Sequence, residues 1–312
     1  MKDFWKRQIE RADDLAAQPG GSTELLKFYG QLLRAQAQIY DRLNTDRDSI
    51  SNDDLQTDLP RIRQILPNLL EAVALHGPPL LASEAKVLLR AETEVIEKIL
   101  IDYWHRPSDI QFFAKAILQP YAYWLVESGV TLRNRELGGG ERSCPKCGGA
   151  PQVSFLQNKE STAESGNRDL LCATCLHSWE FRRVVCAHCG EERPNKLGYF
   201  HSPEFDHIRI EACDSCKHYL KGIDLTRFGF AAPLVDEVYG APLDLGARTW
   251  LHEDRIKLRG VVFRLAEIKP GLRRLDIIYI IRRTTWLFDG GASRRLRFPV
   301  RLKTGDCASS VD

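Results

Sequence analysis

The sequence predicts an α+β protein, in which an all-helical bundle is followed by two tandem metal-binding ribbons. Apolar residues recur at helical spacing up to about residue 137, and three glycines follow at 138–140. Eight of the nine cysteines then form four Cys-x-x-Cys pairs between residues 144 and 216. We therefore expect a helical domain over 1–140, ribbons over 141–185 and 186–228, and a C-terminal extension over 229–312.

The composition is that of a globular protein. The chain has 312 residues, of which 43% are hydrophobic and 28% charged, and this balance argues against wholesale disorder. No segment approaches about 18 continuous apolar residues, so we expect no membrane span. The N-terminus has no apolar run of the kind found in signal peptides, which predicts a cytoplasmic protein. In that reducing compartment, paired cysteines bind metal more often than they form disulfides.

The first half of the chain predicts helices with recognisable starts and breaks. A first helix is expected from Phe4 to Ala17, and a second begins at Ser22 or Thr23, either of which can cap it. The apolar face of the second helix repeats every three or four residues: Leu25, Tyr29, Leu32, Ile39 and Leu43. Residues 46–58 are predicted to be a polar loop. Pro60 suits the first position of the third helix, and Pro67 should bend or split it.

Two further helices are expected after the break at Gly77-Pro78-Pro79. Ser83 is predicted to cap the first, whose buried stripe is Leu88, Val95, Ile96, Ile99 and Tyr103. The second runs from Ile110 to about Leu132, with a kink or interruption at Pro120. We interpret its many aromatic residues as core packing rather than a ligand pocket, because no polar residues converge on them in sequence. The bundle should contain five or six helices.

The cysteine spacing predicts two similar units. There are 24 residues between Cys147 and Cys172, and 23 between Cys189 and Cys213, while only 10 separate Cys175 from Cys186. Short β-like runs at 152–156, 179–185, 196–200 and 208–211 lie between the pairs, as expected for ribbons with metal-binding turns. The repeat favours two tandem sites, although an interleaved pairing stays open. The expected ligand sets are Cys144, Cys147, Cys172 and Cys175 for one metal, and Cys186, Cys189, Cys213 and Cys216 for the other.

The residues around the pairs indicate structural rather than catalytic metal. A glycine follows the first pair of each unit (Gly148, Gly190), where a positive φ would aim backbone amides at the sulfurs. Four thiolates suit zinc or a single iron ion equally well and leave no open position for a substrate, so we expect no enzyme. His177 and His188 could each replace a cysteine, but we interpret them as turn residues. Dithiol redox chemistry lacks the usual βαβ surroundings.

The cysteine region resembles a known family, the formate dehydrogenase formation (accessory) proteins, FdhE. The similarity lies in Cys-Pro-Lys-Cys-Gly at 144–148, the runs 171–189 and 209–221 that contain Trp179 and Tyr219-Leu220-Lys221, and the stretches 233–237 and 243–244. It implies a helical domain followed by rubredoxin-like or zinc-ribbon units, with iron as the associated metal. It also implies a cytoplasmic accessory protein that associates with the catalytic subunit of respiratory formate dehydrogenase before export and is not itself the dehydrogenase.

Asp236, Glu237 and Asp244, with Tyr219 and Lys221, are expected near the ribbons as part of a docking surface. The alternative interpretation is a solvated acidic stretch that caps helices.

Two other functions remain open at this point. Zinc ribbons often bind nucleic acid, but the acidic residues between Cys144 and Tyr219 offset the basic ones, and the whole chain carries a net charge of only +2. A rubredoxin-like iron site could transfer one electron.

Residues 251–312 have 14 Lys or Arg against 7 Asp or Glu, which makes the tail basic and leaves the rest of the chain net acidic. Within the tail, Cys307 is interpreted as a free thiol.

Overall fold

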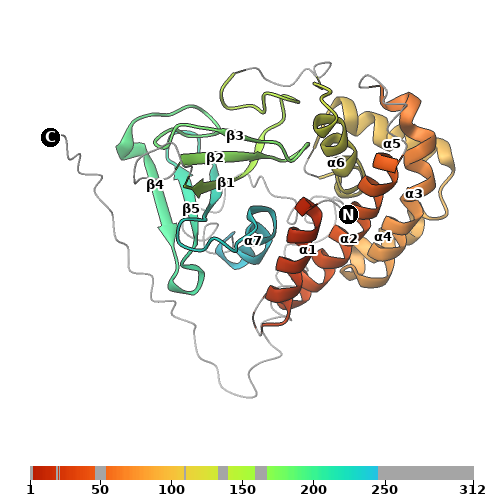
Figure 1. Cartoon of the computed structure of the whole chain (residues 1–312), viewed down its shortest axis with the longest axis horizontal. Coiled ribbons are helices and arrows are strands. Elements are labelled where there is room, and N and C mark those ends of the chain that lie inside the picture. The colour runs from red at the N-terminus through yellow and green to blue at the C-terminus, as the bar shows by residue number, and fades with distance from the viewer. Residues whose placement is uncertain are drawn as a thin grey trace, which may run out of the picture.

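The protein has a helical half and a β half, with one short helix between them (Figure 1). This computed structural model describes residues 3–18, 20, 22–45, 54–108, 110–132, 140–158 and 167–244. The predicted α+β class is confirmed. The basic tail 251–312, with Cys307, lies outside the described residues.

Among the described residues, six helices build the helical half, in agreement with the predicted number. They are α1 (Asp3–Ala16), α2 (Thr23–Thr45), α3 (Leu55–His76), α4 (Pro79–Leu88), α5 (Thr93–His105) and α6 (Phe112–Glu127). Helix α2 packs against α1, α3 and α6 and buries the stripe that its sequence predicts, including Tyr29, Leu32 and Ile39. None of the described helices is both long and apolar enough to span a membrane.

Both prolines of α3 lie inside one continuous helix. It begins at Leu55, because the side chain of Asp54 accepts a hydrogen bond from the amide of Gln56 and caps the first turn. Pro60 therefore lies inside the helix and not at its predicted first position, and Pro67 does not split the helix into separate elements. A proline inside a helix costs about 3 kcal/mol. Nine buried residues of α3 make the packing large enough to offset that cost.

The prediction of one long helix capped by Ser83 was wrong. The structure has two shorter helices there, and Ser83 lies inside α4, which starts at Pro79. Two tight backbone turns separate α4 from α5, with amides of Arg90 and Ala91 bonded to carbonyls three residues earlier. Val95, predicted to be buried, is 49% exposed. No glycine or proline occurs between 88 and 93, so the break has no local signal.

Helix α6 is the centre of the helical half. Every residue from Phe113 to Leu125 is buried, including Tyr121 and Trp124 at 0% exposure, which confirms that its aromatic residues form the core. The hydroxyl of Tyr121 donates to Asp58 on α3 at 2.8 Å. Pro120 does not interrupt the helix, and α6 ends at Glu127 rather than near Leu132. A helix buried on all sides gains enough from packing to tolerate one missing backbone hydrogen bond.

In the part of the chain that the structure describes, the β half is one six-stranded sheet with the order β3-β2-β1-β6-β5-β4. Its strands are β1 (Pro151–Gln157), β2 (Asn167–Cys172), β3 (Ser178–Glu180), β4 (Leu197–His201), β5 (Ile208–Cys213) and β6 (Tyr219–Asp224). Short 3₁₀ turns, η2 (Pro194–Lys196) and η3 (Pro203–Phe205), flank β4. Each cysteine unit contributes three antiparallel strands, and the two units join through the parallel pair β1·β6.

Three of the four predicted strand regions are confirmed, as β1, β4 and β5. The fourth, 179–185, is mostly not a strand, because β3 ends at Glu180 and the chain turns into the next cysteine pair. Strands β2 and β6 were not predicted. Their buried charged residues, Arg168, Asp169 and Lys221, break the alternation of apolar and polar residues that identifies a strand.

Helix α7 (Pro233–Tyr239) lies between the sheet and α1 (Figure 1). It packs against α1, α2, β1 and β6, and five of its seven residues are buried. The part of the chain after residue 228 thus begins in the middle of the molecule. This position makes α7 the main connection between the two halves.

Candidate metal centres

The first cluster contains Cys144, Cys147, Cys172 and Cys175, all at most 3% exposed. Cys144 and Cys147 lie on the turn before β1, Cys172 is the last residue of β2, and Cys175 lies on the turn that follows it. The sulfurs of Cys144 and Cys175 are 3.6 Å apart, and those of Cys147 and Cys172 are 3.4 Å apart. Because β1 and β2 pair along their length, their adjacent ends bring the two turns together.

The second cluster repeats this plan with Cys186, Cys189, Cys213 and Cys216. Its sulfurs are 3.7 Å apart between Cys186 and Cys216 and also between Cys189 and Cys213. The structure thus groups the eight cysteines in the tandem arrangement that the spacing favours, and the interleaved one is not seen. The second cluster is more open, since Cys189 is exposed and Cys216 is half-buried.

The sulfur positions fit a tetrahedral site for one metal ion. Zinc–sulfur bonds of about 2.3 Å imply sulfur–sulfur distances of about 3.8 Å in a regular tetrahedron. The measured 3.4–3.7 Å are close to that value, whereas a disulfide would need about 2.05 Å. Hydrogen bonds from its three neighbours lower the pKa of Cys144, while burial raises the pKa of Cys172. Four sulfurs this close can all be ionised only with a cation among them.

The backbone of each cysteine turn supports the sulfurs. Gly148 and Gly190 have φ of +67° and +79°, which confirms the predicted role of these two glycines. The second pairs use the same conformation without glycine, at Leu176 (+56°) and Lys217 (+58°). This feature was not predicted, although the equivalent position in the repeat indicates it. The amides of Gly149 and Thr174 point at sulfurs at 3.4 and 3.3 Å, as expected for ligands held by backbone donors.

The first cluster is tied to the helical half. Gln119 of α6 donates to the carbonyl of Ala173, between Cys172 and Cys175, at 2.9 Å. The amide of Leu132, after α6, donates to the carbonyl of Lys146, between the other two cysteines, also at 2.9 Å. Both cysteine turns of this cluster are therefore held by hydrogen bonds from α6 and from the segment that follows it.

Two histidines flank the second cluster. The rings of His188 and His218 stack at 3.5 Å between centroids, and one nitrogen of each ring lies within 4.8 Å of the other and of the Cys216 sulfur. His218 contacts the carbonyl of Cys216 through Nδ1 at 2.8 Å, so that nitrogen carries the proton and donates. Each cluster nevertheless has four cysteines, and no histidine replaces one. His177 belongs to none of the three groups of possible ligands among the described residues.

The prediction that the residues around α7 form a docking surface was wrong. The alternative prediction, a solvated acidic stretch, was also wrong. Asp236, Glu237 and Asp244 are at most 5% exposed, and Lys221 is 4% exposed. The Lys221 ammonium lies 2.8 Å from Glu237 and 2.7 Å from Asp244, to which Tyr219 also donates. Burial alone would lower the pKa of Lys221, but the charges of Asp244 and Glu237 outweigh it and raise that pKa. These residues therefore pair with one another in the interior and present no surface to a partner.

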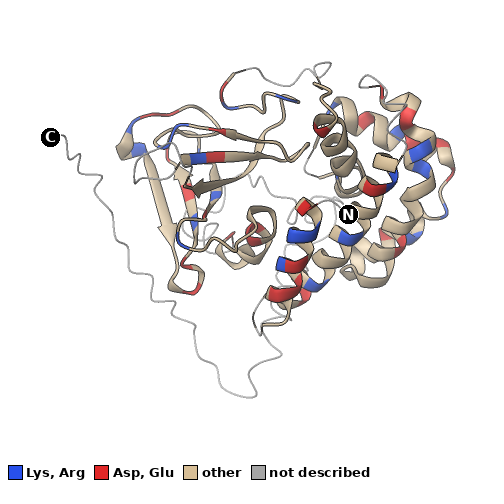
Figure 2. Cartoon of the chain, in the orientation of Figure 1, with Lys and Arg blue, Asp and Glu red and all other residues tan. Residues whose placement is uncertain are grey.

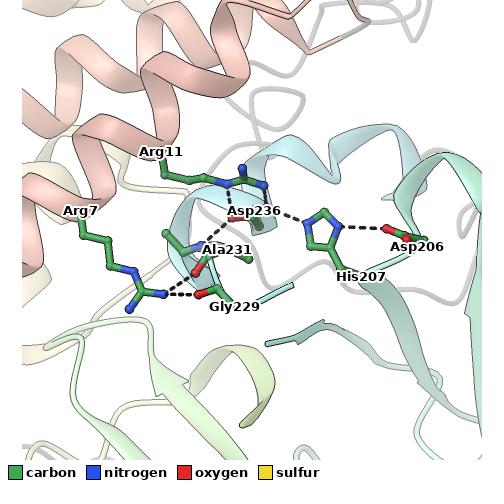
Figure 3. A network of polar contacts seen from close by, with 8 residues as sticks. Arg7, Arg11, Asp206, His207, Gly229, Ala231 and Asp236 are labelled. Atoms are coloured by element: carbon green, nitrogen blue, oxygen red, sulfur yellow. Dashed lines mark hydrogen bonds and ion pairs between the residues drawn. The ribbon is translucent and has the colours of Figure 1, made fainter. Parts of the chain in front are cut away.

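A second buried network joins α1 to α7 (Figure 3). Arg11 donates to both carboxylate oxygens of Asp236, at 2.6 and 3.0 Å, and His207 lies 2.8 Å from the same side chain. Arg7 donates to the carbonyls of Gly229 and Ala231 and fixes the loop before α7. Burial alone would raise the pKa of Asp236, but the hydrogen bonds of His207 and Arg11 lower it overall.

The chain is similar to known proteins in both sequence and structure. No family model matches it. It is 29% identical over 245 residues to the protein FdhE homolog of Aquifex aeolicus, covering 73% of this chain and 84% of that protein. The solved structure of the FdhE protein from Pseudomonas aeruginosa superposes with a TM-score of 0.56 and covers 83% of this chain and 94% of that one, at 24% identity. The chain is similar in sequence and in fold to FdhE proteins.

The similarity to other FdhE homologues is more local. The chain is 32% identical to the FdhE homolog of Stutzerimonas stutzeri over 123 residues, which span 37% of that protein. The alignment with the FdhE homolog of Pseudomonas aeruginosa spans 44% of its length. The chain thus matches less than half of these two relatives. The alignment with the Aquifex protein covers most of that protein, and the crystal structure of the FdhE protein from Pseudomonas aeruginosa shows a similar fold.

Proposed function

We propose that this protein is an accessory protein that assists maturation of a respiratory formate dehydrogenase and binds its catalytic subunit in the cytoplasm. The observation that carries the proposal is the similarity to an FdhE homolog over 84% of that protein's length. Two four-cysteine clusters lie in the region through which the sequence resembles this family. Neither cluster offers a position for a substrate, which agrees with a binding role rather than catalysis.

The eight clustered cysteines would hold two metal ions, either iron or zinc, one in each cluster. When bound, such an ion links four thiolates and neutralises part of their charge. The chain's own contribution is the set of turns with positive φ and the amides directed at the sulfurs. Metal analysis of protein purified without oxygen should give two ions per chain. A metal-free chain that keeps its native fold would contradict this assignment.

Binding to the dehydrogenase can be tested directly. A tagged chain, expressed in a host that makes respiratory formate dehydrogenase, should recover the catalytic subunit. Asp13→Asn, which changes only an exposed ion pair with Arg34, should recover as much. Deletion of the gene should abolish respiratory formate oxidation while the transcript of the catalytic subunit persists. Normal formate oxidation in the deletion strain would refute the proposal.

The nucleic-acid alternative gains no support from the charge distribution. Basic and acidic residues occur side by side on α1 and on the outer helices, as Figure 2 shows. In the β half, Arg168 and Arg209 both pair with Glu211, and Arg182 pairs with Glu192. A nucleic-acid interface would instead require a face of unpaired basic residues.

A further inference from the structure

The two cysteine clusters differ in their access to solvent. The four cysteines of the first cluster are between 0% and 3% exposed. In the second cluster, Cys213 and Cys186 are buried, but Cys216 is half-buried and Cys189 is exposed. The ligand sets are chemically identical, so the difference comes from the surroundings.

The first cluster is surrounded by core residues, and the second cluster by surface residues. All four cysteines of the first cluster belong to the main hydrophobic core, together with residues of the helices such as Trp5 and Leu69. Within the described part of the chain, none of the second four belongs to that core. The second cluster is held by surface contacts, such as those of Arg142 with the carbonyl of His188 and of Ser215 with Glu191. Opening it would disrupt few buried contacts.

We propose that the second cluster is an exchangeable metal site, which takes up and releases its ion through Cys189, whereas the first cluster holds its ion permanently. The inference rests on the metal ligation proposed above, and it does not depend on the role in formate dehydrogenase maturation. It assigns different tasks to two sites with the same ligands. The class of exchange partner is a thiol-bearing chelator or protein that can reach the exposed sulfur.

The exchange step is a substitution of one thiolate for another. Cys189 gives up its sulfur–metal bond as an incoming thiolate forms a new one, and no electrons are transferred. The proton that the incoming thiol loses is taken up, through solvent, by the Cys189 thiolate. Cys216 is the next sulfur within reach, because it is half-buried. In the first cluster an incoming thiolate would have to displace core residues before it could reach any sulfur.

The test is the kinetics of zinc release from the full chain loaded with two zinc ions. With a colorimetric chelator in excess, one equivalent should leave at least about tenfold faster than the other. Pulse alkylation with N-ethylmaleimide and peptide mapping should show modification of Cys186, Cys189, Cys213 and Cys216 in the fast phase. The four cysteines of the first cluster should be modified only in the slow phase.

Matched variants assign the fast phase to its cluster. Cys189→Ser should retain one slowly released zinc ion and the helical circular dichroism of the wild type. Cys147→Ser, at the matching position of the first cluster, should lose native structure. Because release from an unfolded variant cannot be compared, the release kinetics and alkylation map of the wild type then decide which cluster loses its ion first. Release of both ions in one phase, or early alkylation of the first cluster, would overturn the inference. A wild-type chain that binds no metal would instead refute the metal assignment on which it rests.

Discussion

At the level of single residues, Gly222 on β6 shows how tightly the sheet is packed around its buried charges. A Cβ at this position would lie 2.6 Å from Glu211 Oε1 and 3.0 Å from Ser154 Oγ. The Glu211 carboxylate cannot easily move away, because Arg168 donates to it at 2.6 Å and Arg209 at 2.8 Å. Burial alone would raise the pKa of Glu211, but the two arginine charges lower it overall.

We therefore expect Gly222→Ala to destabilise the protein by about 1–3 kcal/mol, the usual cost of overpacking. Chemical denaturation followed by circular dichroism measures this change. Gly198→Ala on β4 is the matched control, since its Cβ would meet nothing closer than the Phe200 ring at 3.9 Å. The control should be neutral or slightly stabilising. Equal destabilisation by both substitutions would show that the contact with Glu211 is unimportant.

Lys217 presents the opposite case, a side chain where glycine would fit better. Its φ of +58° costs an L-residue about 1–2 kcal/mol, and glycine avoids this strain. Glycine in turn loses about 0.5–1 kcal/mol through the entropy of the unfolded chain. Lys217→Gly should thus stabilise the metal-loaded protein slightly, visible as a higher melting temperature. Lys196→Gly, at a position without positive φ, should lower it.

At the level of secondary-structure elements, the contact between α1 and α7 depends on one buried carboxylate. Asp236 is fully buried and accepts hydrogen bonds from Arg11, His207 and the amide of Ala232. Asp236→Asn would keep the shape but leave the Arg11 charge buried without its partner. Such a loss costs about 3–5 kcal/mol. Urea denaturation should show it, while Asp13→Asn in the exposed pair with Arg34 should change stability by less than about 1 kcal/mol.

The same carboxylate predicts a pH dependence of stability. The folded protein lowers the pKa of Asp236 below its unfolded value of about 3.9. Its stabilising contribution is therefore complete above about pH 4 and is lost as the pH falls through the lower, folded pKa. The melting temperature of the wild type should fall on acidification below about pH 4. The part of this decrease that is due to Asp236 should be absent in Asp236→Asn. If the melting temperature of that variant decreases as much as that of the wild type below about pH 4, Asp236 is not the group responsible.

Local patterns predict the helices and cysteine turns better than the contacts between distant segments. Helical spacing identifies α2 and α6, and the cysteine repeat indicates both clusters and the glycines with positive φ. The burial of Asp236 depends on Arg11, which is 225 residues away in the chain. A run of acidic residues next to a proline resembles a solvated helix start, and nothing nearby indicates a buried partner. The same limit hides the pairing of β1 with β6.

At the level of the whole molecule, the helical and β halves share one hydrophobic core. The cluster of buried residues that contains Trp5 and Trp124 also contains Val153 of β1, Val235 of α7 and the first cysteine cluster. Hydrogen bonds from Gln119 and Leu132 to the cysteine turns cross the same boundary. Neither half can therefore unfold without exposing core residues of the other.

This shared core predicts that the described halves unfold together and that metal removal weakens both. Structural zinc contributes about 10–16 kcal/mol of apparent binding energy in zinc-finger peptides, and here the first ion would stabilise part of the common core. Thermal unfolding of the loaded chain should give one transition, with coincident far-UV and near-UV circular dichroism.

Removal of both ions by a chelator should lower the melting temperature of the helices as well. Removal of the fast-exchanging ion alone should have a much smaller effect, because the second cluster lies outside that core. Helices that melt at the same temperature with and without metal would show that the two halves are energetically independent.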